Sequence, residues 1–207
     1  MTDVSAFIFL NISSMHGFYY VYIILVGVCL LRSVIRKDIL TVYFSVVLLV
    51  DLYMFFFYKQ IGFNLHPYAI IFYCCYFIYY YRSLAAKPGV SYGLIFLILC
   101  LGLGLVFSSE NPYSIPLIMM LSVVYIVIPL LWFFNEIMSG NDQKITDKQK
   151  FWTSTAMLFW IVFFIFKMIP LYFFDSNDPD FLRVLDNIYQ VATIISYLIF
   201  CKSLYHR

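Results

Sequence analysis

Charged residues are scarce in this sequence. Asp, Glu, Lys and Arg make up 12% of its 207 residues, whereas about 25% is usual for a soluble domain. Hydrophobic residues reach 64%, against about 45–50% in soluble domains. Such a composition excludes both a disordered chain and a soluble globular domain. We therefore expect a protein that crosses a membrane several times.

The chain also lacks the patterns that mark nucleic-acid, metal and most enzyme sites. Its formal net charge is +2, without the clustered basic patch typical of nucleic-acid binding. Its five cysteines lie in or beside apolar runs and have no zinc-site spacing. HExxH, GxSxG and phosphate-binding glycine loops are absent. We predict no nucleic-acid partner, no metal, no cofactor and no catalytic residue.

Long apolar runs dominate what is present. Because a spanning helix needs about 20 mostly apolar residues, the sequence predicts seven of them. They cover residues 18–35, 39–58, 67–81, 90–107, 115–138, 151–174 and 181–205. The runs are continuous rather than alternating, which favours helices over a transmembrane β-barrel. The predicted fold is a single all-α membrane domain over residues 1–207, with residues 4–12 as an interfacial segment or an extension of the first helix.

The Lys and Arg residues are distributed unevenly between the loops. The N-terminal tail and the even-numbered loops contain Lys59 and Arg183. The odd-numbered loops and the C-terminal end contain the following basic residues: Arg32, Arg36, Lys37, Arg82, Lys87, Lys144, Lys148, Lys150, Lys202 and Arg207. By the positive-inside rule, the N-terminus lies outside and the C-terminus in the cytoplasm. We expect the bacterial cytoplasmic (inner) membrane.

Three ionisable residues lie inside predicted spans. Charges within the hydrocarbon are costly and mark functional sites by default. Counting residues from the outer helix ends places Asp51 and Lys167 about 10 Å deep and Asp186 about 8 Å deep. The three side chains therefore share one level in the outer half of the membrane.

The simplest arrangement places Lys167 between Asp51 and Asp186, which makes the second, sixth and seventh helices neighbours. Asn187 and Gln190 extend the polar stripe on the last helix, where Gln190 shares the face of Asp186. Two interpretations are open. The cluster is either an ionic clamp that fixes helix packing or an outward-facing site for an ion or a small ligand.

Aromatic residues make up 22% of the chain. Most are expected to form the aromatic belts at the two membrane interfaces, with a ligand cage as the alternative. The run FWTSTAMLFWIVFFIF at residues 151–166 is followed by an acidic loop at residues 175–180 and a last helix. In this layout the chain resembles small orphan seven-helix membrane proteins of bacteria. The resemblance implies a sensory or accessory module encoded beside signalling or defence proteins.

The leading functional hypothesis is a non-enzymatic module that binds a small ligand or ion at the outward site. Because the loops are short, its output would pass to a cytoplasmic protein partner at the basic loops. The alternative is a channel or transporter, including an oligomeric pore that acts as an effector or accessory of a defence system. An intramembrane lipid enzyme is a third class, for which the sequence offers no good nucleophile.

Overall fold

Seven α-helices account for most of the residues that the structure describes. The computed structural model describes residues 16–57, 62–84, 88–108, 115–139, 144–173 and 179–206, and it contains no strand within these ranges. The helices are α2 (His16–Ile35), α3 (Leu40–Phe56), α5 (His66–Tyr80), α6 (Pro88–Ser108), α7 (Ile115–Met138), α8 (Gln149–Phe173) and α9 (Pro179–Ser203), with short 3-10 segments η2 (Arg82–Leu84) and η3 (Ile145–Asp147). The described part of the chain is all-α, and each helix coincides closely with one predicted span. The predicted segment at residues 4–12 lies outside the described ranges.

Helix length separates two of the seven helices from the others. Five are long and apolar enough to cross a membrane, namely α2, α6, α7, α8 and α9. Helix α3 has 17 residues and α5 has 15, which is fewer than the roughly 20 needed to cross the hydrocarbon core. The chain therefore has the helices of an integral membrane protein, while seven complete spans stay a prediction.

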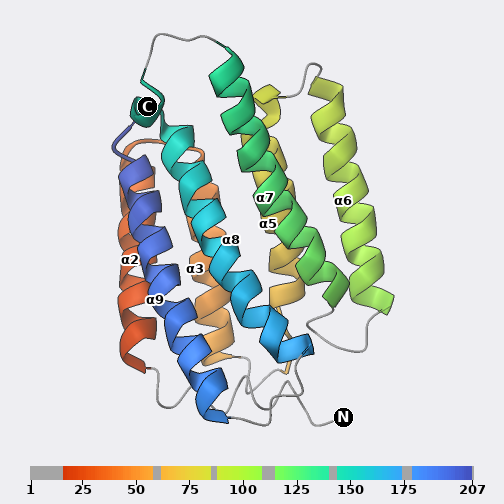
Figure 1. Ribbon diagram of the computed structural model, residues 1–207, viewed down its shortest axis with the longest axis vertical. Coiled ribbons are helices and arrows are strands. Elements are labelled where there is room, and N and C mark those ends of the chain that lie inside the picture. Colours follow the sequence, from red (N-terminus) through yellow and green to blue (C-terminus); the bar gives the residue numbers. More distant parts are fainter. Residues whose placement is uncertain are drawn as a thin grey trace.

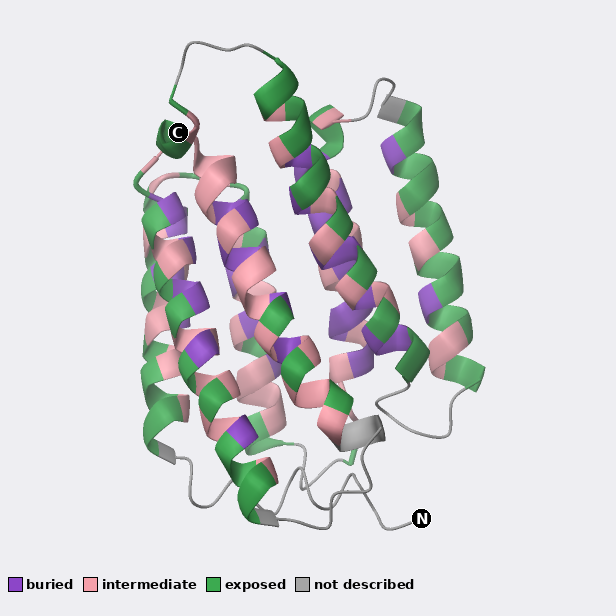
Figure 2. Ribbon diagram, viewed as in Figure 1, coloured by how far each residue is buried: buried purple, intermediate pink, exposed green. Residues whose placement is uncertain are grey.

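Six of the helices form a closed ring. Helix α2 packs against α3 and α9, α9 against α8, α8 against α7, α7 against α5, and α5 against α3. Figure 1 shows these helices running up and down the long axis of the molecule. Their inward faces carry the buried residues, and their outward faces are apolar and exposed (Figure 2). A ring of this kind leaves a central space that all six helices can line.

Helix α6 stands outside the ring at one edge of the molecule (Figure 1). It packs mainly against α5, and most of its surface is exposed (Figure 2). The contact is close at Gly102, where an added Cβ would lie 2.7 Å from Cγ1 of Ile71. Small residues let transmembrane helices approach in this way.

Helices α8 and α9 make the most extensive helix pair. Their contact is lined by small side chains, with Ala156, Ala192 and Ser196 all buried. The hydroxyl of Ser196 donates to the backbone carbonyl of Ala156 at 2.9 Å. This hydrogen bond joins the two helices in a region with little water to compete for it.

The two ends of the bundle differ in charge. At one end, here called the basic end, α2, α5, α7 and α9 finish while α3, α6 and α8 begin (Figure 1). The described basic residues there are Arg32, Arg36, Lys37, Arg82, Lys144, Lys148, Lys150 and Lys202. Lys59, Lys87, Arg207 and most of the acidic loop lie outside the described residues. The gathering of charge agrees with the loop pattern, and orientation across a membrane stays a prediction.

Candidate functional site

A cavity of about 380 Å³ occupies the centre of the ring. Every ring helix contributes to its wall, beginning with Phe18 on α2 and His66 on α5 near the end opposite the basic end. The wall continues to Tyr43 on α3 and Phe200 on α9, deeper in the bundle. The cavity lining therefore extends along the ring axis from the end opposite the basic end to within three residues of the start of α3 and of the end of α9.

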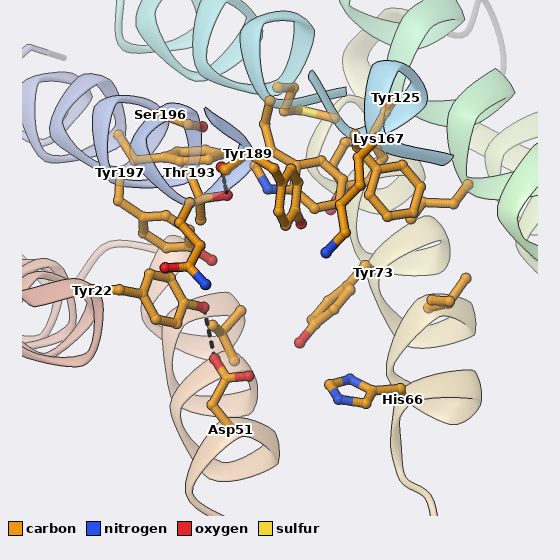
Figure 3. A pocket seen from close by; sticks show the side chains of 18 of the residues that line it. Tyr22, Asp51, His66, Tyr73, Tyr125, Lys167, Tyr189, Thr193, Ser196 and Tyr197 are labelled. Atoms are coloured by element: carbon orange, nitrogen blue, oxygen red, sulfur yellow. Dashed lines mark hydrogen bonds between the residues drawn. The ribbon is translucent and has the colours of Figure 1, made fainter. Parts of the chain in front are cut away.

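Asp51 lies in the wall of this cavity on α3. The hydroxyl of Tyr22 donates to Oδ2 of Asp51 at 2.6 Å, and the hydroxyl of Tyr19 donates to the backbone oxygen of Asp51 at 3.1 Å. Figure 3 shows the first of these bonds, with the carboxylate facing the cavity. Two tyrosines of α2 thus fix this part of α3, and one of them satisfies a carboxylate oxygen.

Lys167 enters the cavity from α8. Its Nζ lies 2.5 Å from Oδ1 of Asp186 on α9 and 4.6 Å from the centre of the Tyr189 ring. The side chains of the ion pair are 21% and 22% exposed. The carboxylate of Asp186 and the ring of Tyr189 together stabilise the ammonium group of Lys167 in a largely apolar setting.

The structure brings most of the predicted site residues together. Asp51, Lys167 and Gln190 line the cavity, and Asp186 pairs with Lys167 behind the wall. Asn187 is half-buried on α9 but is not part of the described cavity wall. Four of the five predicted residues therefore belong to one site.

The predicted position of Lys167 between two aspartates is wrong in one respect. Within the described part of the chain, Lys167 forms an ion pair with Asp186 and not with Asp51. The reason is the order of the helices, because α2 and α9 lie side by side and α3 is separated from α8 by the cavity. Tyr22 instead supplies the hydrogen bond that Asp51 accepts.

Tyrosines are the feature of the site that sequence reasoning missed. Seven line the cavity, and they come from five of the six ring helices: Tyr19, Tyr22, Tyr43, Tyr73, Tyr125, Tyr189 and Tyr197. Trp160 of α8 completes the aromatic lining and stacks on Phe164 with ring centres 4.8 Å apart. One signal was available on α9, where Tyr189, Thr193 and Tyr197 recur every four residues and so share one helix face.

The inner end of the cavity is closed by four aromatic residues that we call the aromatic plug: Tyr43, Phe44, Phe77 and Phe200. Their rings pack edge to face or tilted, with centres 5.0 Å apart for Tyr43 and Phe77 and 5.9 Å for Phe44 and Phe200. All four are buried. Beyond them lie Leu40 and Leu204, which are fully buried. A second pocket, of about 810 Å³, lies at the basic end, with Ile39, Tyr80 and Trp132 in its wall.

The groups around the cavity are suited to binding rather than to metal coordination. Within the described residues, no group of three or more His, Cys, Asp or Glu side chains is placed to hold a metal ion. What the wall offers is one carboxylate, one ion pair, several phenolic hydroxyls and a large area of aromatic and aliphatic surface. Ligand sites in proteins commonly combine an apolar wall with a few polar groups of this kind.

Comparison of the chain with family models, curated proteins and solved structures finds no match in any of the three sets.

Proposed function

We propose that this protein is an integral membrane module that binds a small molecule in the central cavity and transmits occupancy to a partner at the basic end. The observation that carries the proposal is a cavity lined by six helices, polar at Asp51 and Lys167 and closed at its inner end. With the basic end in the cytoplasm, Asp51 and Lys167 in the cavity wall belong to the outer half of the membrane.

The size of the cavity supports a small organic ligand. A cavity of about 150 Å³ is enough to hold benzene, and ligand pockets commonly measure about 300–1,000 Å³. The volume of about 380 Å³ falls within that range. A space shared by six helices is also a place where a ligand contacts many elements at once, which a sensor requires.

The aromatic plug favours this proposal over a channel through one chain. A pore needs polar or hydrated surface along its whole length. On the basic side of the cavity, the ring interior instead contains buried Phe44, Phe77 and Leu204. A transporter would have to move these side chains in every cycle, whereas a receptor leaves them in place.

A chain of contacts leads from the cavity to the basic end. The hydroxyl oxygens of Tyr197 and Tyr43 lie 3.4 Å apart, and the Tyr43 ring stacks on Tyr76 with centres 5.6 Å apart. The hydroxyl of Tyr76 donates to the carbonyl of Ile39, just before α3 begins. A shift of α9 at the cavity would therefore reach the start of α3.

At the basic end, polar contacts join the starts and ends of four elements. Gln149 at the start of α8 donates to Oδ2 of Asp38 at 2.5 Å. Lys148 pairs with Glu136 of α7, and Lys150 donates to Ser83 of η2 at 2.7 Å. We assign the partner-facing output to this region, because it is the charged surface to which the contacts from the cavity lead.

Cysteine accessibility tests the proposal. Thr193→Cys, in the cavity wall, and Ser203→Cys, beyond the plug, would each be made in a chain whose native cysteines are replaced. In proteoliposomes, a membrane-impermeant thiol reagent is expected to label the first variant, and only when added on the cavity side. The second variant is the matched control and should resist that reagent.

Ion flux through the same vesicles completes the test. We expect no conductance above that of empty liposomes from unsubstituted protein, and the same result for Lys167→Met. Labelling of both cysteine variants from the cavity side, together with flux that Lys167→Met changes, would contradict the proposal and establish a conduction path. Resistance of Thr193→Cys from either side would show that the cavity is closed to solutes, which also contradicts it.

A further inference from the structure

The charges of the cavity wall point to a particular class of ligand. Among the described residues, the charged side chains in the wall are Asp51 and Lys167. Lys167 is already neutralised by Asp186 at 2.5 Å. Asp51 receives a hydroxyl hydrogen bond from Tyr22, and no described cation lies within ion-pair distance of it. The wall therefore presents one negative charge without a positive counterpart.

Aromatic rings surround that carboxylate. Tyr22 and Tyr19 approach it from α2, with Tyr19 stacked on Phe55 at 5.3 Å between ring centres. Figure 3 shows the hydroxyl of Tyr73 and the ammonium of Lys167 directed toward the same part of the cavity as Asp51. Phenolic oxygens, like a carboxylate, accept hydrogen bonds from an ammonium group. A carboxylate among tyrosines is thus a binding site for a positive group.

The deeper wall indicates the rest of the ligand. Beyond Asp51 the cavity is lined by apolar side chains, among them Val47, Leu121 and Met157, and it ends at the plug. An inorganic cation would gain nothing from these groups, and a single carboxylate is too few ligands for a divalent metal ion. A molecule with an ammonium group at one end and an apolar body at the other matches both parts of the wall.

We infer that the cavity binds an amphipathic organic cation, with its ammonium group at Asp51 and its apolar body against the aromatic plug. The inference deepens the proposed function and rests on it. The single unpaired carboxylate in the wall matches a ligand with one ammonium group. A carboxylate ligand would instead have to compete with Asp186 for Lys167 and would face repulsion from Asp51.

Three probes of nearly equal shape test the inference. Phenethylamine is a cation, phenethyl alcohol is neutral and phenylacetate is an anion. Binding would be followed by the fluorescence of Trp160, which lies in the wall, after Trp132→Phe and Trp152→Phe remove the other tryptophans. Isothermal titration of the unsubstituted protein gives the same comparison without these changes.

We expect the amine to bind at least about tenfold more tightly than the alcohol, because a charged hydrogen bond contributes more than a neutral one. Phenylacetate should bind most weakly. Asp51→Asn should abolish the preference for the amine while preserving the acceptor for Tyr22. Asp147→Asn, at an exposed position in η3 at the basic end, is the matched control and should leave the preference unchanged.

Equal affinity for amine and alcohol in the unsubstituted protein would overturn the inference, and this comparison does not depend on the folding of any variant. Retention of the preference in Asp51→Asn would overturn it as well, as would a failure of all three probes to bind. The proposed function is judged separately. Tight binding of the alcohol, or labelling of Thr193→Cys from the cavity side, would leave a ligand-binding cavity in place with a different ligand class.

Discussion

Loss of the ammonium group in Lys167→Met tests how the ion pair of α8 and α9 is organised. Methionine preserves most of the apolar stem of lysine, so the change removes the charge while limiting the loss of packing. The variant leaves Asp186 without the cation that lies 2.5 Å away, and it also removes the contact of that cation with the Tyr189 ring. An uncompensated carboxylate in a largely apolar setting is the main source of the expected destabilisation.

The magnitude follows from the partial exposure of the pair. Exposed ion pairs contribute about 0.2–1 kcal/mol, and breaking a buried pair costs about 3–5 kcal/mol. Because the two side chains are 21% and 22% exposed, the cost lies between these limits. We expect a fall of about 2 kcal/mol in the free energy of unfolding. At about 2–4 °C per kcal/mol, the melting temperature should fall by roughly 5 °C.

Thermal unfolding in detergent of four proteins provides the assay: the unsubstituted chain, Lys167→Met, and Lys167→Met combined with either Asp186→Asn or Asp51→Asn. Asp186→Asn should restore much of the lost stability, because it removes the carboxylate that the first change exposes. Asp51→Asn should restore none, because Tyr22 and not Lys167 satisfies that group. Equal rescue by the two changes, or an unaltered melting temperature in Lys167→Met, would refute the pairing.

Two further predictions concern helix contacts. Gly102→Ala should destabilise the packing of α6 on α5 by about 1–3 kcal/mol, since its Cβ would lie 2.7 Å from Ile71. Gly104→Ala, where nothing lies within 4 Å, should be neutral or stabilising in the same thermal assay, and an equal loss in both variants would contradict the close approach. Tyr22→Phe removes the hydrogen bond to Asp51 and should cost about 1.5–3 kcal/mol of stability, measured against a Tyr→Phe change at an exposed position of α6. No difference between the two tyrosine variants would show that this bond does not stabilise the fold.

The helices could be predicted from sequence because their signals are local. Each predicted apolar run coincides closely with one helix, and the residues between the helices break the helical backbone. Pro67 lies in the first turn of α5, while Lys37 and Gly62 adopt positive φ values between helices. The apolar run at residues 67–81 is 15 residues long, and so is helix α5, because helix length follows from the length of the run and needs no tertiary information.

The candidate site was harder to predict. The depth of a residue in the bundle follows from counting residues along its helix. The side of the ring on which the residue lies depends instead on how the helices pack together. Counting residues from the helix ends correctly placed Lys167 and Asp186 at one level, and consecutive helices brought them together. Asp51 shares that level but belongs to α3, which the cavity separates from α8. The order of helices around a ring depends on which faces pack together, and no single helix carries that information.

The tyrosine lining was missed for a related reason. Tyrosines near helix ends fit an aromatic belt as well as a cavity wall, and composition alone does not separate the two. The distinction depends on whether a ring faces lipid or the ring axis. Helix α9 was the exception, because its residues 189, 193 and 197 fall on one face. Phe200 follows Tyr197 by three residues and belongs to the aromatic plug.

A cavity whose wall is divided among six helices has a consequence for the lifetime of the protein. Any molecule bound there contacts elements from both ends of the sequence, so unfolding of any one ring helix destroys the site. Binding therefore adds to the unfolding free energy of the whole ring, by about 2.7 kcal/mol at a ligand concentration one hundred times Kd. If the cavity binds a ligand as we propose, the unoccupied protein is the more easily degraded form, and the abundance of the protein in the membrane would rise with the supply of that ligand.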